Sequence, residues 1–156
     1  FRKAIIGREH AGGHEHSTTL NAIHLLEKLY LKRGCYYKAE LLCRRIVKSN
    51  IILHGKEHPI TLKSLNNLGS LLFLRLKLIQ AEPMYRQVLE SRKKILGDNH
   101  PSTLTSLNNL GVLLQKKADI ESIKESQKIL QLAYDNRKII LGSDHPDTIV
   151  SKNNLK

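Results

Sequence analysis

The sequence predicts an all-α fold, an α-solenoid of stacked antiparallel helix hairpins, because it repeats and because each repeat has helical apolar spacing. A block that begins with His58 recurs at His100 and His145, and a fainter copy begins at His16, so the copies are spaced by 42, 42 and 45 residues. Within a copy, apolar residues recur every three or four positions, which is the spacing of a helix rather than a strand. Stacking such units buries a continuous core.

A period near 42 residues also fits propeller blades and HEAT or armadillo units. Composition and spacing favour a lengthened helical hairpin. Tryptophan is absent, and Leu62, Leu65, Leu68 and Leu72 follow one another at steps of three or four residues. Each unit is therefore interpreted as two helices.

Prolines and glycines mark where the helices begin and end. Proline suits the first helical position because its missing N–H would have no partner there, so the histidines before Pro59, Pro101 and Pro146 are predicted to be helix caps. A left-handed glycine commonly follows the last helical residue, as at Gly55. The equivalent glycines are Gly97 and Gly142. The predicted helices span residues 17–32, 37–53, 59–75, 79–96, 101–116, 119–141 and 146 onward.

The repeats divide the chain into one continuous array. The predicted divisions are residues 1–15, the end of a preceding unit and a linker; 16–57, repeat one; 58–99, repeat two; 100–144, repeat three with a three-residue insertion; and 145–156, the start of repeat four. The chain begins at Phe1 without a starting methionine or the apolar core of a signal peptide, so it is interpreted as an excised fragment. An array needs polar terminal faces, so end-to-end self-association through uncapped repeats is expected.

Two glycines inside first helices predict close packing. Glycine at Gly69 and Gly111 costs about 1 kcal/mol relative to alanine, and we expect it there to let the second helix approach closely. The small Ala39 and Ala81 are expected on the facing side. Glu27 takes the glycine position in repeat one, whose hairpin is therefore expected to be looser.

The insertion in repeat three is expected to lengthen its second helix by about 4.5 Å. A step of seven residues returns to the same helix face as a step of four, so the apolar stripe keeps its direction. The residues predicted to face the core are Ile120, Ile123, Leu130, Ala133 and Tyr134. The alternative is a longer turn around residues 117–119. The helical placement further predicts a displaced next helix and a groove distorted between Asn109 and Asn154.

A resemblance to the tetratricopeptide repeat family is carried in the second unit by Leu68, Gly69, Leu72, Ala81 and Tyr85. The unit reads LG-x-x-HP-x-T-L-x-SLNNLG and then AEPMYRQVLESRKKILG, which is similar to the 42-residue subtype in kinesin light chains and related adaptor proteins. The resemblance covers essentially the whole chain. It implies a solenoid whose first helices line a concave groove that binds an extended peptide. It also implies that asparagines hold the peptide backbone and that basic residues accept its acidic side chains, as in an adaptor or scaffold.

Amides on the first helices are the candidate binding groups. With the leucines facing the core, the polar positions between them fall on the remaining faces. A carboxamide both donates and accepts hydrogen bonds, as a grip on a peptide main chain requires. The predicted peptide-binding residues are Lys63, Asn66, Asn67, Ser70, Thr105, Asn108, Asn109 and Lys116. In each asparagine pair, Asn67 and Asn109 are favoured over their neighbours as ligand contacts. Repeat one has His24 and Leu25 at these positions, which argues against peptide contact there.

Charge and composition narrow the function classes. Lysine and arginine number 26 against 14 acidic residues, a net charge of +12, so the expected partner is a protein or peptide with acidic residues. A basic solenoid that binds nucleic acid is the alternative. Against it, the units lack an aromatic stacking platform, and much of the positive charge lies on second helices, at residues 44–48 and 92–94. The sequence contains no glycine-rich phosphate loop, no nucleophile elbow and no paired carboxylates outside the repeat positions, so an enzyme is not expected.

Further patterns argue against a membrane span, a metal site and a disulfide. No apolar stretch approaches the roughly 20 residues that cross a bilayer. His10, His14 and His16 lie close together, but nothing completes a tetrahedral set of ligands, so no cofactor is expected. Cys35 and Cys43 would lie about 12 Å apart on a helix, too far for a disulfide. Free thiols favour a reducing, cytoplasmic location.

Overall fold

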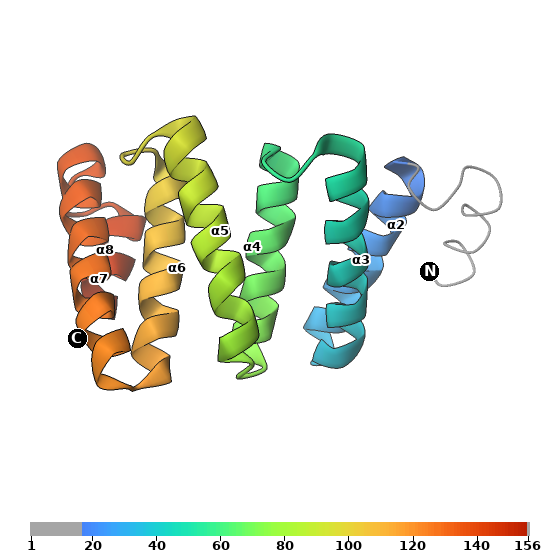
Figure 1. Cartoon of the computed structure of the whole chain (residues 1–156), viewed down its shortest axis with the longest axis horizontal. Coiled ribbons are helices and arrows are strands. Elements are labelled where there is room, and N and C mark those ends of the chain that lie inside the picture. Colours follow the sequence, from blue (N-terminus) through green and yellow to red (C-terminus); the bar gives the residue numbers. More distant parts are fainter. Residues whose placement is uncertain (1–16, 156) are drawn as a thin grey trace. The chain divides into compact units, whose positions relative to one another are not determined.

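The computed structural model describes residues 17–155, and every element of secondary structure in this range is a helix (Figure 1). The helices are α2 (Ser17–Lys32), α3 (Tyr36–His54), α4 (Pro59–Leu74), α5 (Leu78–Leu96), α6 (Pro101–Lys117), α7 (Ile120–Leu141) and α8 (Pro146–Asn154). Their ends agree with the predicted ends to within one residue, and the all-α prediction is confirmed. The predicted linker, residues 1–15, and the histidines at its end, His10, His14 and His16, lie outside the described residues.

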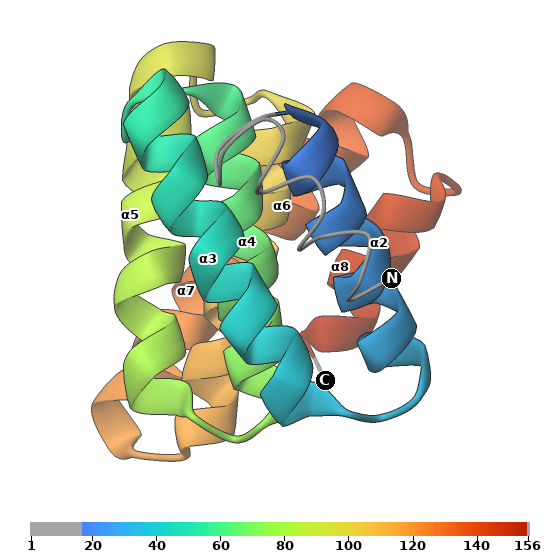
Figure 2. The same ribbon diagram turned by 90° about the vertical axis from the view of Figure 1, so that its right-hand side faces the viewer.

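Helix contacts divide the chain into two units, residues 1–75 and 76–156. In the first unit, α3 packs against both α2 and α4 (Figures 1 and 2). In the second, α6 packs against α5 and α7, and α8 packs against α7 and, with fewer contacts, against α6. The predicted pairing of α4 with α5 in repeat two would join the units and stays a prediction.

Histidine caps begin three of the helices, as predicted. The Nδ1 atom of His58 accepts a hydrogen bond from the backbone N–H of Ile60 at 3.3 Å, and proline follows at the first helical position. His100 and His145 do the same for α6 and α8, at 3.1 and 3.2 Å. Each cap satisfies one of the backbone N–H groups that a helix start leaves without a partner.

Glycine ends α3, α5 and α7, but its conformation differs from the predicted one. Gly55 has φ 88° and ψ 167°, and Gly97 and Gly142 are nearly identical. The positive φ is as expected, whereas the ψ value is extended rather than left-handed helical. Almost only glycine adopts this combination, and it turns the chain directly toward the next histidine cap.

Close approach of the two helices of repeat three explains Gly111. A Cβ atom at this position would lie 2.6 Å from both Cγ and Cδ2 of Leu130 on α7. The Gly111 carbonyl also accepts a hydrogen bond from Ser126 Oγ at 2.7 Å. Ser126 is the counterpart of the predicted small residue Ala81, so the expectation of small side chains opposite the glycine holds in repeat three, with Leu130 added to the contact.

Repeat one accommodates Glu27 by a smaller residue on the facing helix. Cys43 of α3 occupies the position that Leu130 holds in repeat three, and its Sγ lies 3.4 Å from Glu27 Oε1. Glu27 is only 6% exposed. Side-chain volume has therefore moved from the second helix of the hairpin to the first, an alternative to the looser packing expected from the sequence.

The insertion in repeat three lengthens α7, as predicted. This helix has 22 residues against 19 in both α3 and α5, which adds about 4.5 Å. The predicted inward direction is correct for Leu130 and Ala133 but wrong for Ile120, 73% exposed, and Ile123, 37% exposed. The extra residues lie at the start of α7, just beyond the end of α6, where little surrounds an isoleucine. The small Ser122 is buried there instead.

The expected displacement of the helix after the insertion is also wrong. Arg92 on α5 donates to the Ser102 carbonyl and to Ser106 Oγ at 2.9 and 2.8 Å. Arg137 on α7 makes the equivalent bonds to α8, at the same two distances. Because the insertion lies at the start of α7, the C-terminal end of α7 contacts α8 in the same way as the C-terminal end of α5 contacts α6.

Candidate functional site

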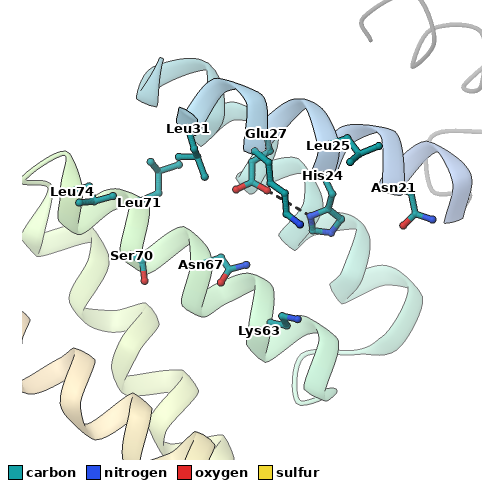
Figure 3. Close-up of a pocket in the computed structure, with 11 residues that line it drawn as sticks. Asn21, His24, Leu25, Glu27, Leu31, Lys63, Asn67, Ser70, Leu71 and Leu74 are labelled. Atoms are coloured by element: carbon teal, nitrogen blue, oxygen red, sulfur yellow. Dashed lines mark ion pairs between the residues drawn. The ribbon is translucent and has the colours of Figure 1, made fainter. Parts of the chain in front are cut away.

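A groove of about 700 Å³ lies between α2 and α4, the first helices of repeats one and two (Figure 3). Its lining combines amides, lysines, a buried carboxylate and leucines. The lining residues are Asn21, His24, Leu25, Glu27, Lys28 and Leu31 of α2 and Lys63, Asn67, Ser70, Leu71 and Leu74 of α4. Both helices belong to the first unit, so the groove is formed within one unit of the structure.

The two walls use equivalent repeat positions. Three lining residues of α2 lie 42 positions before three lining residues of α4. The pairs are Asn21 with Lys63, Leu25 with Asn67, and Lys28 with Ser70. Sequence reasoning found the α4 members and missed the α2 members, because it looked for asparagine rather than for the position. A shift of the α4 residues by one repeat length finds all three.

The α4 wall carries the predicted polar groups. Lys63 and Asn67 are exposed, and Figure 3 shows both on the groove side of α4 with Ser70. Ser70 Oγ donates to the Asn66 carbonyl at 3.1 Å. Asn66 itself is half-buried and does not line the groove.

The apolar part of the lining complements these polar groups. Leu25 and Leu74 are 54% and 60% exposed, and each comes from a different wall. Exposed leucines beside amides offer an extended peptide both main-chain hydrogen bonds and apolar side-chain contacts. The sequence argued against peptide contact at His24 and Leu25, yet both residues line this groove.

The predicted residues of α6 belong to the second unit, where two of them are engaged within the protein. Thr105 Oγ1 donates to the Pro101 carbonyl at 2.9 Å and accepts from Arg137 Nη2 at 3.0 Å. Asn108 is buried, and its Oδ1 accepts from Asn154 Nδ2 on α8 at 3.0 Å. Asn109 is half-buried and Lys116 exposed. The structure thus gathers Lys63, Asn67 and Ser70 in one groove and gives Asn108 a role between α6 and α8.

Glu27 is the charged group set deepest in the groove. Its Oε2 lies 3.6 Å from His24 Nδ1, and its Oε1 accepts from the Cys43 thiol at 3.4 Å. Burial, with the Glu27 carboxylate close by, raises the pKa of Cys43 to about 12. Cys43 is therefore a neutral thiol whose S–H donates a hydrogen bond to the carboxylate, and it adds no charge to the groove.

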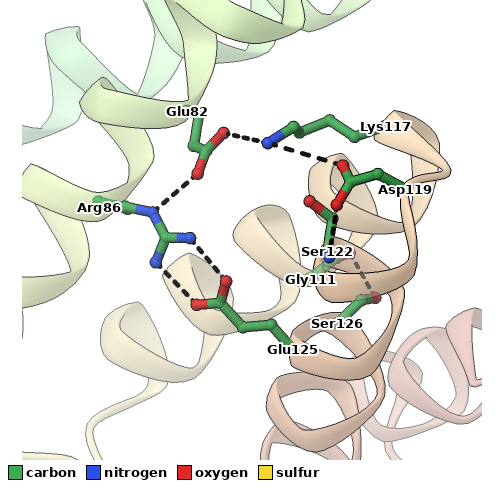
Figure 4. A network of polar contacts seen from close by, with 8 residues as sticks. All are labelled: Glu82, Arg86, Gly111, Lys117, Asp119, Ser122, Glu125 and Ser126. Carbon is green, nitrogen blue, oxygen red and sulfur yellow. Dashed lines mark hydrogen bonds and ion pairs between the residues drawn. The ribbon is translucent and has the colours of Figure 1, made fainter.

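Ion pairs outside the groove hold successive repeats together (Figure 4). Glu82 of α5 accepts from Arg86 at 2.9 Å and from Lys117, at the end of α6, at 3.0 Å. Arg86 also forms a two-bond pair with Glu125 of α7, at 2.8 and 2.7 Å. Burial raises the pKa of Glu82, but the hydrogen bonds from Lys117 and Arg86 outweigh it and hold the pKa below its usual range. The bonds from Arg86 likewise lower the pKa of Glu125.

The same clamp recurs one repeat earlier. Glu40 of α3 is buried and pairs with Arg44 at 2.8 Å and with Arg75, the residue that caps α4. Its members lie 42 positions before Glu82, Arg86 and Lys117. These cations are committed to the stack, so they do not form a binding surface.

Neither a metal centre nor a membrane span is present in the described part of the chain. Residues 17–155 bring no group of three or more His, Cys, Asp or Glu side chains into a metal-binding arrangement. Within the same residues, none of the helices has the length and apolarity to cross a membrane. Both cysteines, Cys35 and Cys43, are free.

Comparison with known proteins agrees with this geometry. A putative kinesin light chain of Podosopora anserina with nearly identical TPR-like repeats superposes with a TM-score of 0.81 at 23% identity, over 99% of this chain and 72% of its own. A variant of that protein gives a TM-score of 0.83. BtubC from P. vanneervenii gives 0.75 at 24% identity, over 88% of this chain and 54% of its own. At these identities the likeness establishes the fold.

No curated protein sequence is significantly similar to the chain. The family model for the tetratricopeptide repeat matches residues 61–102 and 103–147, which together make up more than half of the sequence. The chain therefore belongs to the tetratricopeptide repeat family, with the kinesin light chain-like form of the fold, and is a protein–protein interaction module.

Proposed function

We propose that the groove between α2 and α4 binds an extended peptide segment with acidic residues from a partner protein, and that the chain acts as an adaptor or scaffold. The observation that carries the proposal is the pairing of equivalent positions on the two groove walls. Lys28 and Lys63 come from opposite walls and supply the positive charge for acidic side chains. Asn21 and Asn67, also on opposite walls, supply amides for the peptide main chain.

Nucleic acid is the weaker candidate because many cations of the second helices have partners. Arg44 pairs with Glu40, and Arg92 turns inward to Ser102 and Ser106 of α6. Lys93 and Lys94 lie 3.6 Å from the carboxylates of Asp98 and Glu90. These four cations are therefore held by carboxylates or by α6 and are less available to a phosphate backbone.

The remaining parts of the proposal concern setting and assembly. The free thiols of Cys35 and Cys43 suit a cytoplasmic location. Ile149 and Val150 of α8 are 45% and 48% exposed, and we propose that they support end-to-end self-association. The division into repeats 16–57, 58–99 and 100–144 belongs to the same proposal. The role is binding without catalysis.

Substitutions on the α4 wall test the proposal. Peptides selected from a random displayed library on the whole chain would be synthesised and their Kd measured by fluorescence anisotropy. A net hydrogen bond contributes about 0.5–1.5 kcal/mol, so Asn67→Ala should weaken binding about two- to twelvefold. Lys63→Ala should weaken acidic peptides most.

Matched controls separate the groove from the rest of the surface. Asn136→Ala on α7 and Lys48→Ala on α3 remove the same side chains from second helices and should leave the Kd unchanged. Equal affinity of the Asn67 and Lys63 variants and the native chain would place the site elsewhere. Binding of a random oligonucleotide that survives about 200 mM salt would favour the nucleic acid reading instead.

A further inference from the structure

Repeat one carries a carboxylate at the position where repeats two and three carry glycine. Glu27 is the counterpart of Gly69 and Gly111, and it lines the groove between α2 and α4. Figure 3 shows it between His24 and Leu31 on α2, across from the α4 residues of the groove. The smaller Cys43 on α3 makes room for this side chain.

Glu27 has few partners for a carboxylate that is more than nine-tenths buried. Among the described residues, its oxygens meet only the Cys43 thiol at 3.4 Å and the His24 imidazole at 3.6 Å. A thiol is a weak donor, and 3.6 Å is too long for a good hydrogen bond. By contrast, Glu40, the other buried glutamate among the described residues of this unit, pairs with two arginines.

A buried carboxylate without a strong cationic partner is costly to the protein alone and favours a ligand that supplies the cation. Neither groove lysine serves as that partner, since neither Lys28 nor Lys63 forms an ion pair with Glu27. The groove therefore has two kinds of charged position: a buried acceptor on α2, and ammonium groups on both walls.

We propose that Glu27 forms a cation-accepting subsite, so that the bound peptide places a lysine or arginine side chain against it while acidic residues reach Lys28 and Lys63. The inference rests on the proposed function and specifies the partner as a mixed-charge segment. It also explains how repeat one takes part in binding although it lacks the asparagine pair. The cation of the peptide would complete the interactions of Glu27, whereas an all-acidic segment would be repelled there.

Peptide scanning with the whole chain tests this subsite. The probes are capped ten-residue peptides of Asp, Leu and Ser in which one scanned position is Lys, Arg, norleucine or Glu, with binding measured by fluorescence anisotropy. Norleucine keeps the length of lysine without its charge. At one position, we expect Lys or Arg to bind about ten- to a hundredfold tighter than norleucine, and Glu to bind more weakly still. In Glu27→Gln the preference for the cation should vanish, while the Kd of the norleucine peptide stays the same.

Controls distinguish this inference from the proposed function. Glu90→Gln on α5, an exposed glutamate that pairs with Lys94, should keep the full cation preference. Suppose that peptides bind and that Lys63→Ala weakens their binding. The subsite is then refuted, and the groove stands, if the lysine and norleucine peptides bind the native chain with equal affinity. The same holds if Glu27→Gln keeps the preference for lysine that the native chain shows. If no peptide binds, both proposals fall. Should Glu27→Gln fail to fold by circular dichroism, the lysine-to-norleucine ratio on the native chain still decides.

Discussion

Gly111→Ala tests the claim that α6 and α7 pack too closely for a side chain. The new Cβ would lie 2.6 Å from Cγ and Cδ2 of Leu130, about 1 Å inside normal carbon contact. Leu130 is 1% exposed, so other side chains surround it and limit its movement. Overpacking costs about 1–3 kcal/mol, and the better helix propensity of alanine offsets about 1 kcal/mol. Since two atoms of a confined side chain overlap, we expect the upper end of the cost and a net loss of about 2 kcal/mol.

Urea denaturation followed by far-ultraviolet circular dichroism measures this loss. In thermal unfolding, the same change of 2 kcal/mol should lower the midpoint temperature by about 4–8 °C in a chain of this size. Gln127→Ala, at an exposed position of α7, is the matched control and should not lower stability. The native pair of Glu27 with Cys43 suggests the rescue: Leu130→Cys should make room for the added methyl group.

Additivity decides whether the reasoning is right. Leu130→Cys alone leaves a cavity and should destabilise by about 1–3 kcal/mol. In the double variant the added methyl group occupies the cavity that Leu130→Cys leaves. The combined loss of stability should therefore be at least about 1 kcal/mol smaller than the sum of the two single losses. A Gly111→Ala protein as stable as the native one, or strictly additive losses, would refute the packing account.

Two further predictions concern the contacts between repeats. Asn50 occupies the position of Arg92 and Arg137, and its buried Nδ2 has no hydrogen-bond partner among the described residues. Asn50→Arg should therefore bond to Ser64 and raise the free energy of unfolding by about 1–2 kcal/mol in urea denaturation. A lower free energy of unfolding would show that α3 lacks room for the guanidinium. The lowered pKa values of Glu82 and Glu125 mean that their stabilisation is present above the ordinary carboxylate pKa of 4.5 and is lost as the pH falls through the lower folded values. The urea midpoint of unfolding should therefore decrease as the pH is lowered below about 4.5, and it should decrease less steeply in Glu125→Gln. The same dependence of the midpoint on pH in this variant would contradict this account.

The helices could be predicted from sequence because their ends carry strong local signals. Histidine, proline and glycine at fixed offsets set the start of α4 and the end of α3 to within one residue. The direction of Ile120 and Ile123 could not, because a period of three or four residues does not reveal at which end an insertion lies. Nor could the partnership of Glu27 with Cys43, since nothing in either local pattern indicates that the two side chains meet.

The groove was predicted in part, and the missing part has one cause. Residues that repeat, such as Asn66 and Asn108, attract attention in a sequence. Repetition also marks residues that hold one repeat to the next. Asn108 illustrates this, since it bonds to Asn154 across α6 and α8. Residues that differ between units, such as His24 and Leu25, were set aside although they line the groove.

The proposed binding groove therefore depends on divergence between repeats more than on their repetition. The shared side chains form the stack: the clamp around Glu40 recurs around Glu82, and the contact of Arg92 recurs at Arg137. Once these contacts set the spacing of the helices, the exposed positions of α2 and α4 are free to vary without loss of the fold. Glu27 is the clearest case, because it replaces a glycine needed for packing elsewhere and places a buried charge where a partner can meet it.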